Sequence, residues 1–163
     1  MAEQPVVCDT SPLIKLAGVG LLDLLPHLYG TIWIAPEVRA EYQVKALASE
    51  PSLDHLPWLV VTPVVVERAL STMRNFGAGE AATISLASAS RARAVILDDR
   101  LGRRVATERQ LPIVGTMGVL LRAKRAGLVG AIAPIVDSMI AQGRHISPAL
   151  RAQILHAADE GEE

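Results

Sequence analysis

The stretch Val6-Val7-Cys8-Asp9-Thr10-Ser11-Pro12 decides how this chain is interpreted. Its first three residues are typical of a β-strand, and Ser11-Pro12 has the pattern of a helix start, with Ser11 as N-cap and Pro12 in the first helical position. Asp9 is then expected at the C-terminal end of a buried strand, where ligands and reacting groups bind in open α/β sheets. The alternative for Asp9 is a structural role in the turn, because Asp is common there.

Length and composition limit the architecture. The chain has 163 residues, half of them hydrophobic, which suits one domain with a substantial core. We assign residues 1–158 to a single domain and residues 159–163 to an acidic tail. The net charge of -1 gives no general attraction to nucleic acid, so such a function needs a local patch or a bound metal. Aromatic residues make up 3% of the chain, which argues against platforms for base stacking.

The sequence also bears on location. Its first residues lack the basic segment and long apolar run of a signal peptide, and no apolar run is long enough to span a bilayer. We therefore expect a cytoplasmic protein without a membrane segment. The single cysteine, Cys8, lies in the first predicted strand, where a buried structural thiol is the favoured interpretation.

Predicted strands and helices alternate along the chain. Short β-branched or apolar runs predict strands at 31–35, 58–62, 94–97 and 112–114, and helices are predicted between them, among them 67–74 and 80–89. Such alternation predicts an α/β fold, a three-layer α/β/α sandwich with a mainly parallel sheet. Extra C-terminal helices are predicted at 132–142 and from Ser147-Pro148, an N-cap followed by proline, to about residue 158.

Acidic residues occur next to these predicted strands and helices. Glu41 lies one turn after Glu37 on one helix face, Glu80 opens a helix of small residues, and Asp98 and Asp99 end an apolar strand. Each has an ordinary alternative. Glu41 fits a solvated helix face, Glu80 fits compensation of the helix dipole, and the two aspartates fit ion pairs with the arginines that follow.

Taken together, these carboxylates indicate a metal site. Several carboxylates without cationic partners suit Mg²⁺ or Mn²⁺, because these hard cations prefer oxygen ligands. A cation held there can activate water and neutralise charge on a phosphodiester oxygen, which is nuclease chemistry. The chain has no glycine-rich phosphate-binding pattern, and its single cysteine and scattered histidines lack zinc-ligand spacing.

Five segments in this order carry a family resemblance: VVCDTSPLI, PEVRAEY, GAGEAATISLA, VILDDRLGRRVA and LPIVGTMGVLLRAKRAGL. From about Val6 to Gln142 the chain resembles PIN-domain proteins, specifically the branch that contains many toxin-type ribonucleases of toxin–antitoxin pairs. The resemblance implies a compact α/β/α sandwich, metal-dependent endoribonuclease activity on RNA, and a homodimer neutralised by a small antitoxin protein.

The resemblance also implies roles for individual residues. Asp9, Glu41, Glu80 and Asp99 match the catalytic acids, and Asp9, Glu80, Asp98 and Asp99 are the expected ligands of Mg²⁺ or Mn²⁺. The doubled aspartate departs from the commoner single acid, so the choice between Asp98 and Asp99 stays open.

Other residues are expected to support the site. Ser11 matches the supporting hydroxyl residue of the family. Thr116 either caps the following helix or holds a water or phosphate near the strand ends. Arginine suits bidentate phosphate recognition, and the candidates for RNA phosphate contacts are Arg91, Arg93, Arg100, Arg103 and Arg104. The alternative for these arginines is solvated charge and pairing along a helix face.

Two other functions stay open. The first is a catalytically inactive PIN-like module that binds RNA or protein. The second is a phosphoryl-transfer enzyme with Asp9 as nucleophile, which is disfavoured because the downstream Lys and Ser/Thr that hold phosphate in such enzymes are not evident.

Overall fold

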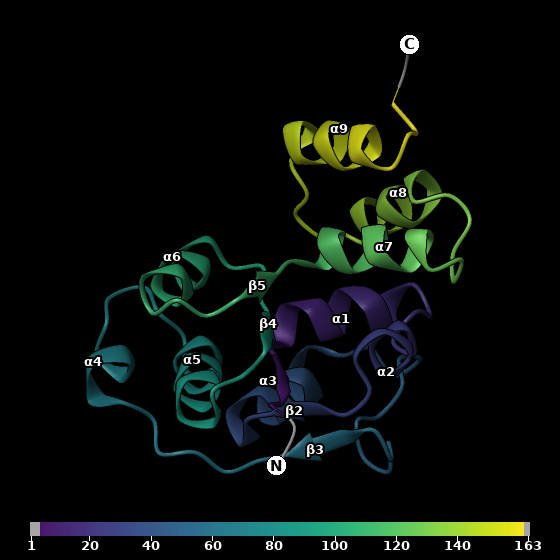
Figure 1. The fold of residues 1–163 in the computed structure, drawn as a ribbon. Helices are drawn as coiled ribbons and strands as arrows, with labels where there is room; N and C mark the ends of the chain where they lie inside the picture. The colour runs from purple at the N-terminus through teal and green to yellow at the C-terminus, as the bar shows by residue number, and fades with distance from the viewer. Residues whose placement is uncertain (1–3, 162–163) are drawn as a thin grey trace.

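Five short strands form one sheet in the computed structural model, which describes residues 4–161 (Figure 1). Every neighbouring pair of strands is parallel, which confirms the predicted sheet. In chain order the strands are β1 (Val6–Cys8), β2 (Ile32–Ile34), β3 (Leu59–Val61), β4 (Ala94–Ile96) and β5 (Ile113–Val114). Their order in the sheet is β3-β2-β1-β4-β5, so the direction of winding reverses between β1 and β4.

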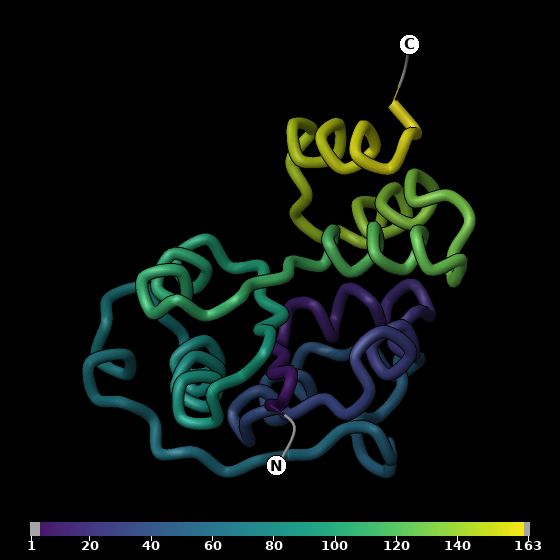
Figure 2. Tube along the Cα trace, in the orientation of Figure 1, coloured from purple at the N-terminus to yellow at the C-terminus, as the bar shows by residue number. Residues whose placement is uncertain are grey.

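Helices cover both faces of this sheet, as Figures 1 and 2 show. One side carries α1 (Thr10–Gly18), α2 (Leu24–Tyr29) and α7 (Thr116–Arg125), and the other carries α4 (Arg68–Ser71), α5 (Ala78–Ser90) and α6 (Arg100–Glu108). Helix α3 (Pro36–Lys45) contacts both α1 and α5. The predicted three-layer α/β/α sandwich is therefore confirmed.

The two central strands, β1 and β4, are fully buried, as expected for parallel strands covered on both faces. Cys8 is in register with Ile96, and the backbone N–H of Asp9 donates to the carbonyl of Ile96 at 3.0 Å. This pairing holds the residue after β1 against the end of β4. At the sheet edge, β3 leaves Val60 and Val61 exposed.

Helix α1 begins earlier than the sequence predicts. Asp9, and not Ser11, occupies the N-cap position, and Pro12 is the third helical residue instead of the first. The prediction was wrong because the backbone of Asp9 is already extended, with ψ 174°, so the strand passes straight into the helix. Pro12 is tolerated because N–H groups in the first turn of a helix have no intrahelical partner.

Three helices after β5 extend the sandwich on one side. Helix α8 (Ala133–Ala141) and helix α9 (Pro148–Ala157) follow α7, and α9 lies farthest from the sheet in Figure 1. Ser147 caps α9 as predicted, because its hydroxyl accepts a hydrogen bond from the N–H of Leu150 at 3.1 Å. No helix within residues 4–161 has the length and apolar character needed to cross a membrane.

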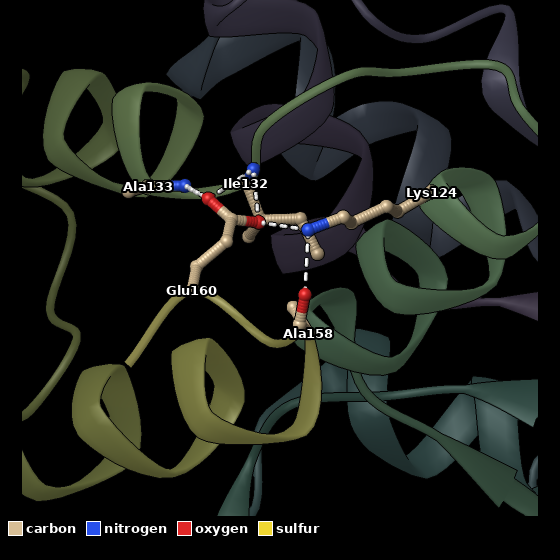
Figure 3. A network of polar contacts seen from close by, with 5 residues as sticks. All are labelled: Lys124, Ile132, Ala133, Ala158 and Glu160. Carbon is tan, nitrogen blue, oxygen red and sulfur yellow. Dashed lines mark hydrogen bonds and ion pairs between the residues drawn. The ribbon is translucent and has the colours of Figure 1, made fainter. Parts of the chain in front are cut away.

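Glu160, which follows α9, makes polar contacts with α7 and with the start of α8 (Figure 3). Its carboxylate accepts hydrogen bonds from the N–H groups of Ile132 and Ala133, at the start of α8, and pairs with Lys124 of α7 at 2.9 Å. Desolvation is the largest single influence and raises the pKa of Glu160, but these donors together outweigh it and lower the pKa to about 2. Glu160, which the sequence places in an acidic tail, is thus bound into the fold.

Helix α4 is shorter than the predicted helix 67–74. The hydroxyls of Ser71 and Thr72 both donate to the carbonyl of Arg68, at 3.1 and 2.8 Å. Such side-chain bonds compete with helix continuation, and Asn75 then adopts a positive φ of 61°. The chain is thereby turned towards the start of α5.

Candidate functional site

Asp9 lies where the winding of the sheet reverses, outside the carboxyl ends of β1 and β4. Open α/β sheets bind their ligands at this kind of position. The side chain is buried, with 3% of the residue exposed, and Oδ1 accepts a hydrogen bond from the Thr83 hydroxyl at 3.1 Å. Thr83 comes from α5, so this bond ties the strand end to the helix on the opposite face.

The surroundings of Asp9 raise its pKa to about 7. Burial is the largest cause, and the negative charges of Glu80 and Glu41 add to it. Hydrogen bonds from the backbone of Thr10 and the hydroxyl of Thr83 act in the opposite direction. Because both glutamates influence Asp9 electrostatically, the fold gathers three of the predicted acids from three separate segments.

Glu41 joins the first turns of two helices. From its place on α3, the carboxylate accepts a hydrogen bond from the Thr10 hydroxyl at 2.8 Å and another from the N–H of Gly79 at 2.9 Å. A Cβ atom at Gly79 would overlap the Glu41 carboxylate, so the observed position of this carboxylate depends on the absence of a side chain there. Glu41 is thus held in place by α1 and α5.

Glu80 lies in the first turn of α5 and is half-buried. Its carboxylate turns back over Gly77, where a Cβ atom would overlap Oε2. Glu80 therefore points towards the start of the helix and contributes negative charge to the surroundings of Asp9. The glycines at 77 and 79 give space to both glutamates.

No cation neutralises this acidic group within the described residues. Asp9, Glu41 and Glu80 make no ion pair with any lysine, arginine or histidine of residues 4–161. Like charges that share a buried site disfavour ionisation unless a cation lies near them. A hard divalent cation would neutralise this negative charge, and it prefers the oxygen ligands that the three carboxylates offer.

The geometry does not form a closed metal cage. Among residues 4–161, no three side chains of His, Cys, Asp or Glu converge on a common point as ligands. Mg²⁺ binds through one or two protein carboxylates together with waters and substrate phosphates, so an open donor set is compatible with it. The residues present therefore fit the ion, with part of its coordination left to water and substrate.

Asp98 makes its side-chain contacts with residues other than Asp9, Glu41 and Glu80. Its carboxylate accepts hydrogen bonds from the Thr116 N–H at 2.7 Å and hydroxyl at 2.5 Å, and pairs with Lys15 of α1 at 2.9 Å. Thr116 does not cap α7 by its side chain, because Gly115 occupies the N-cap position and Thr116 is the first helical residue. The Thr116 hydroxyl instead supports Asp98, and both join the β5–α7 turn to α1.

Asp99 caps helix α6. Its carboxylate accepts a hydrogen bond from the N–H of Gly102 at 2.7 Å. The structure therefore gives each of the two adjacent aspartates its own protein partners, whereas the charges that raise the pKa of Asp9 are those of Glu80 and Glu41. A metal-ligating role for either one stays a prediction.

The remaining predicted residues are dispersed. Ser11 is half-buried in the first turn of α1. Arg100 and Arg104 are exposed on α6, and Arg104 lies 3.4 Å from Glu108. Arg103, on the same helix, lies against the β5–α7 turn, where its Nη1 is 2.8 Å from the position of a Cβ on Gly115.

Arg91 and Arg93 precede β4, at the opposite end of the strands from Asp9. The backbone N–H of Arg93 donates to Pro5, just before β1, and its guanidinium donates to the carbonyl of Tyr29 at 2.7 Å. Both arginines thus lie at the amino ends of the strands, away from Asp9, and a role for them in phosphate contacts stays a prediction.

Sequence reasoning missed three polar partners of the site, Thr10, Lys15 and Thr83. Thr83 lies one turn after Glu80, and its position among small apolar residues is the signal that a buried hydroxyl has a partner. Nothing in the sequence links Lys15 to Asp98, because 83 residues separate them.

Comparison with known families agrees with this geometry. A family model described as a PIN domain (DUF3368) matches residues 5–160, which is nearly the whole chain. Comparison with curated proteins gave no match, and comparison with solved structures gave none. The sheet order, the acidic group at the reversal of winding and the family match lead to one identification: the chain belongs to the PIN-domain family.

Proposed function

We propose that the protein is a Mg²⁺- or Mn²⁺-dependent nuclease that hydrolyses phosphodiester bonds of RNA. The observation that carries this proposal is the group Asp9, Glu41 and Glu80, which lies at the reversal of winding and has no cation partner among residues 4–161. PIN domains are generally metal-dependent nucleases, and the family match supports the same reaction class.

Each residue of the group has a separate task in this proposal. Asp9 and Glu80 hold the cation, and Glu41 accepts from bound water while Thr10 and Gly79 fix its carboxylate. Thr83 keeps Asp9 in one orientation through its hydroxyl. When bound, the cation supplies charge stabilisation for the phosphodiester and lowers the pKa of a water molecule.

Cleavage of a fluorescent RNA with Mn²⁺, and its loss in EDTA, tests the proposal. Asp9→Asn keeps the shape of the side chain but removes its charge, so we expect cleavage to fall by at least ~100-fold, about 2.7 kcal/mol in activation free energy. Asp23→Asn is the matched control, because Asp23 is exposed and makes no side-chain cap bond. Full Mn²⁺-dependent cleavage by Asp9→Asn would show that the assignment is wrong.

The biological role in this proposal is that of a toxin in the cytoplasm. A small antitoxin protein and a homodimer belong to the same proposal. Co-expression tests it: growth arrest by the wild-type chain, its absence with Asp9→Asn, and relief by the product of an adjacent small gene are the expected results. Arrest by Asp9→Asn equal to that of wild type contradicts a toxin role based on cleavage.

One observation favours a second function, an RNA-binding PIN module without turnover. Asp98 and Asp99 are both engaged by protein groups, so the acidic group holds three carboxylates in place of a larger set. Calorimetric titration with Mn²⁺ distinguishes the two functions. Millimolar Mn²⁺ without detectable binding favours the inactive module, and binding that disappears in Asp9→Asn favours the nuclease.

A further inference from the structure

A large cavity lies beside the acidic group and has no assigned role. It encloses about 680 Å³ at the carboxyl ends of β4 and β5, between α6, α7 and the C-terminal helix α9. None of the three site acids lines it. The lining residues that matter here are Lys15, Asp98, Arg103, Arg122, Arg125 and Leu150.

The charge of this cavity is strongly positive. Four of its described lining residues are lysine or arginine, and Asp98 is the single acid among them. Lys15 is already paired with Asp98, whereas Arg103 and Arg125 are exposed and make no ion pair within residues 4–161. Arg122 is also exposed and has no ion pair there, so three arginines remain available to a negatively charged ligand, although the whole chain has a net charge of -1.

Arg122 is held at the cavity by an aromatic ring. Its guanidinium lies 5.9 Å from the centre of the Tyr29 ring and donates to the Tyr29 hydroxyl at 3.3 Å. Arg103 is placed by the absence of a side chain at Gly115, since its Nη1 lies 2.8 Å from where a Cβ atom would be. The fold therefore directs arginines from α6 and α7 to one cavity.

Part of the cavity lining is apolar, with residues from α7 and α9. Leu150 of α9 is 41% exposed, and Met117, Leu121 and Ile154 continue the apolar lining. The volume lies within the range of ~300–1,000 Å³ that encloses a drug-sized molecule. A ligand that combines phosphates with flat, partly apolar rings matches the basic and the apolar residues of this lining, and a few nucleotides of a single strand have this chemistry.

The cavity adjoins the proposed cleavage site. Asp9 and Asp98 follow neighbouring paired strands, and strands in a sheet lie about 4.8 Å apart. Lys15 is six residues beyond Asp9 in the sequence and in α1, which is about 9 Å along the helix axis. A strand with one phosphate at Asp9 therefore has its neighbouring nucleotides within reach of the cavity.

We propose that this cavity binds the segment of single-stranded RNA next to the cleaved bond, with Arg103, Arg122 and Arg125 on its phosphates. The proposal rests on the proposed nuclease function for its choice of ligand. It gives the C-terminal helix α9 a role in the binding of substrate, because Leu150 and Ile154 of α9 are part of the apolar lining. We expect a single strand and not a duplex as the occupant, because a volume of about 680 Å³ has room for a few nucleotides of one strand.

Fluorescence anisotropy with a labelled single-stranded RNA of twelve nucleotides, in EDTA so that no cleavage occurs, tests this assignment. Arg103→Gln with Arg125→Gln should weaken binding at least tenfold at low salt. The slope of log affinity against log salt concentration should fall by about 0.7 for each phosphate that the variant no longer neutralises. Arg68→Gln is the matched control, because Arg68 is exposed on α4 and outside the cavity.

Thermal unfolding of each variant confirms that it is folded. Unlabelled competitors that displace the fluorescent RNA probe identify the occupant of the cavity. We expect unlabelled single-stranded RNA to displace the probe, and duplex RNA and poly-glutamate of equal length to compete at least tenfold less well. Equal competition by the duplex overturns the assignment to a single strand. Equal competition by poly-glutamate overturns it in favour of an acidic protein segment.

The outcome is separable from that of the nuclease proposal. Cleavage by wild-type protein together with unchanged RNA affinity and salt slope in the double arginine variant refutes the cavity assignment alone. Loss of affinity in that variant without Mn²⁺-dependent cleavage by wild type refutes the nuclease and leaves the binding of single-stranded RNA in the cavity standing. Absence of RNA binding by wild-type protein at low salt overturns the cavity assignment.

Discussion

Replacement of Asp9 by Asn should change how the stability of the fold depends on pH. Burial, with Glu80 and Glu41, raises the pKa of Asp9 from 3.8 to about 7. Between about pH 4 and pH 7 the folded state keeps a proton that the unfolded state has released, so the free energy of unfolding falls as pH rises. The full pKa difference corresponds to about 4 kcal/mol, lost by about pH 8.

Urea unfolding of the two proteins in EDTA, from about pH 5 to about pH 8, measures this effect. Asparagine has no charge to bury, so Asp9→Asn should become the more stable protein at the alkaline end, by at most about 4 kcal/mol. For a chain of this length that corresponds to a difference of roughly 10 °C in Tm. Subtracting the free energies of unfolding of the two proteins at each pH removes the contribution of the other titratable groups, which both proteins share.

Added Mn²⁺ should restore stability to wild type at the alkaline end, because a bound cation favours the ionised carboxylate. At about one hundred times its Kd the gain is about 2.7 kcal/mol, and Asp9→Asn should gain less. The exposed Asp23→Asn should behave as wild type throughout. Parallel stability curves for wild type and Asp9→Asn across the whole pH range would refute the reasoning.

Three further substitutions test particular contacts of the fold. Gly79→Ala should displace the Glu41 carboxylate and weaken Mn²⁺ binding, measured by calorimetry. Gly130→Ala is the control, because its added Cβ meets open space, and it should bind Mn²⁺ as wild type does. Equal Mn²⁺ affinity of Gly79→Ala and wild type would contradict this role of Gly79. Lys15→Met leaves a part-buried carboxylate without its cation and should lower the free energy of unfolding by about 1–3 kcal/mol in urea. Glu160→Ala should speed hydrogen exchange across α8, and unchanged exchange there would show that its hydrogen bonds do not secure the helix.

Much of the fold follows from local sequence pattern. Short apolar strands that alternate with helices predicted the parallel sandwich, and Ser147-Pro148 correctly placed the start of α9. Errors occurred where local signals competed. Ser11 and Asp9 are both good N-cap residues, and the extended backbone at Asp9 decided between them.

For the candidate site, residue type was readable from the sequence but partnership was not. The positions of Asp9, Glu41 and Glu80 at strand and helix ends made a shared carboxylate site predictable, and in the fold the charges of both glutamates raise the pKa of Asp9. Asp98 and Asp99 could not be distinguished in this way, because both directly follow the same predicted strand. Their separate contacts, to Lys15 and Thr116 for one and to Gly102 for the other, depend on which helices pack beside the strand end.

The sequence by itself determined the order of strands and helices, the oxygen chemistry of the acidic residues and the family resemblance, because these depend on local pattern and side-chain type. The tertiary structure decided the raised pKa of Asp9 and the arginine-lined cavity beneath α9. Both arise from desolvation and from charges brought together across many residues of chain. Burial and proximity of this kind are properties of packing, which no local pattern encodes.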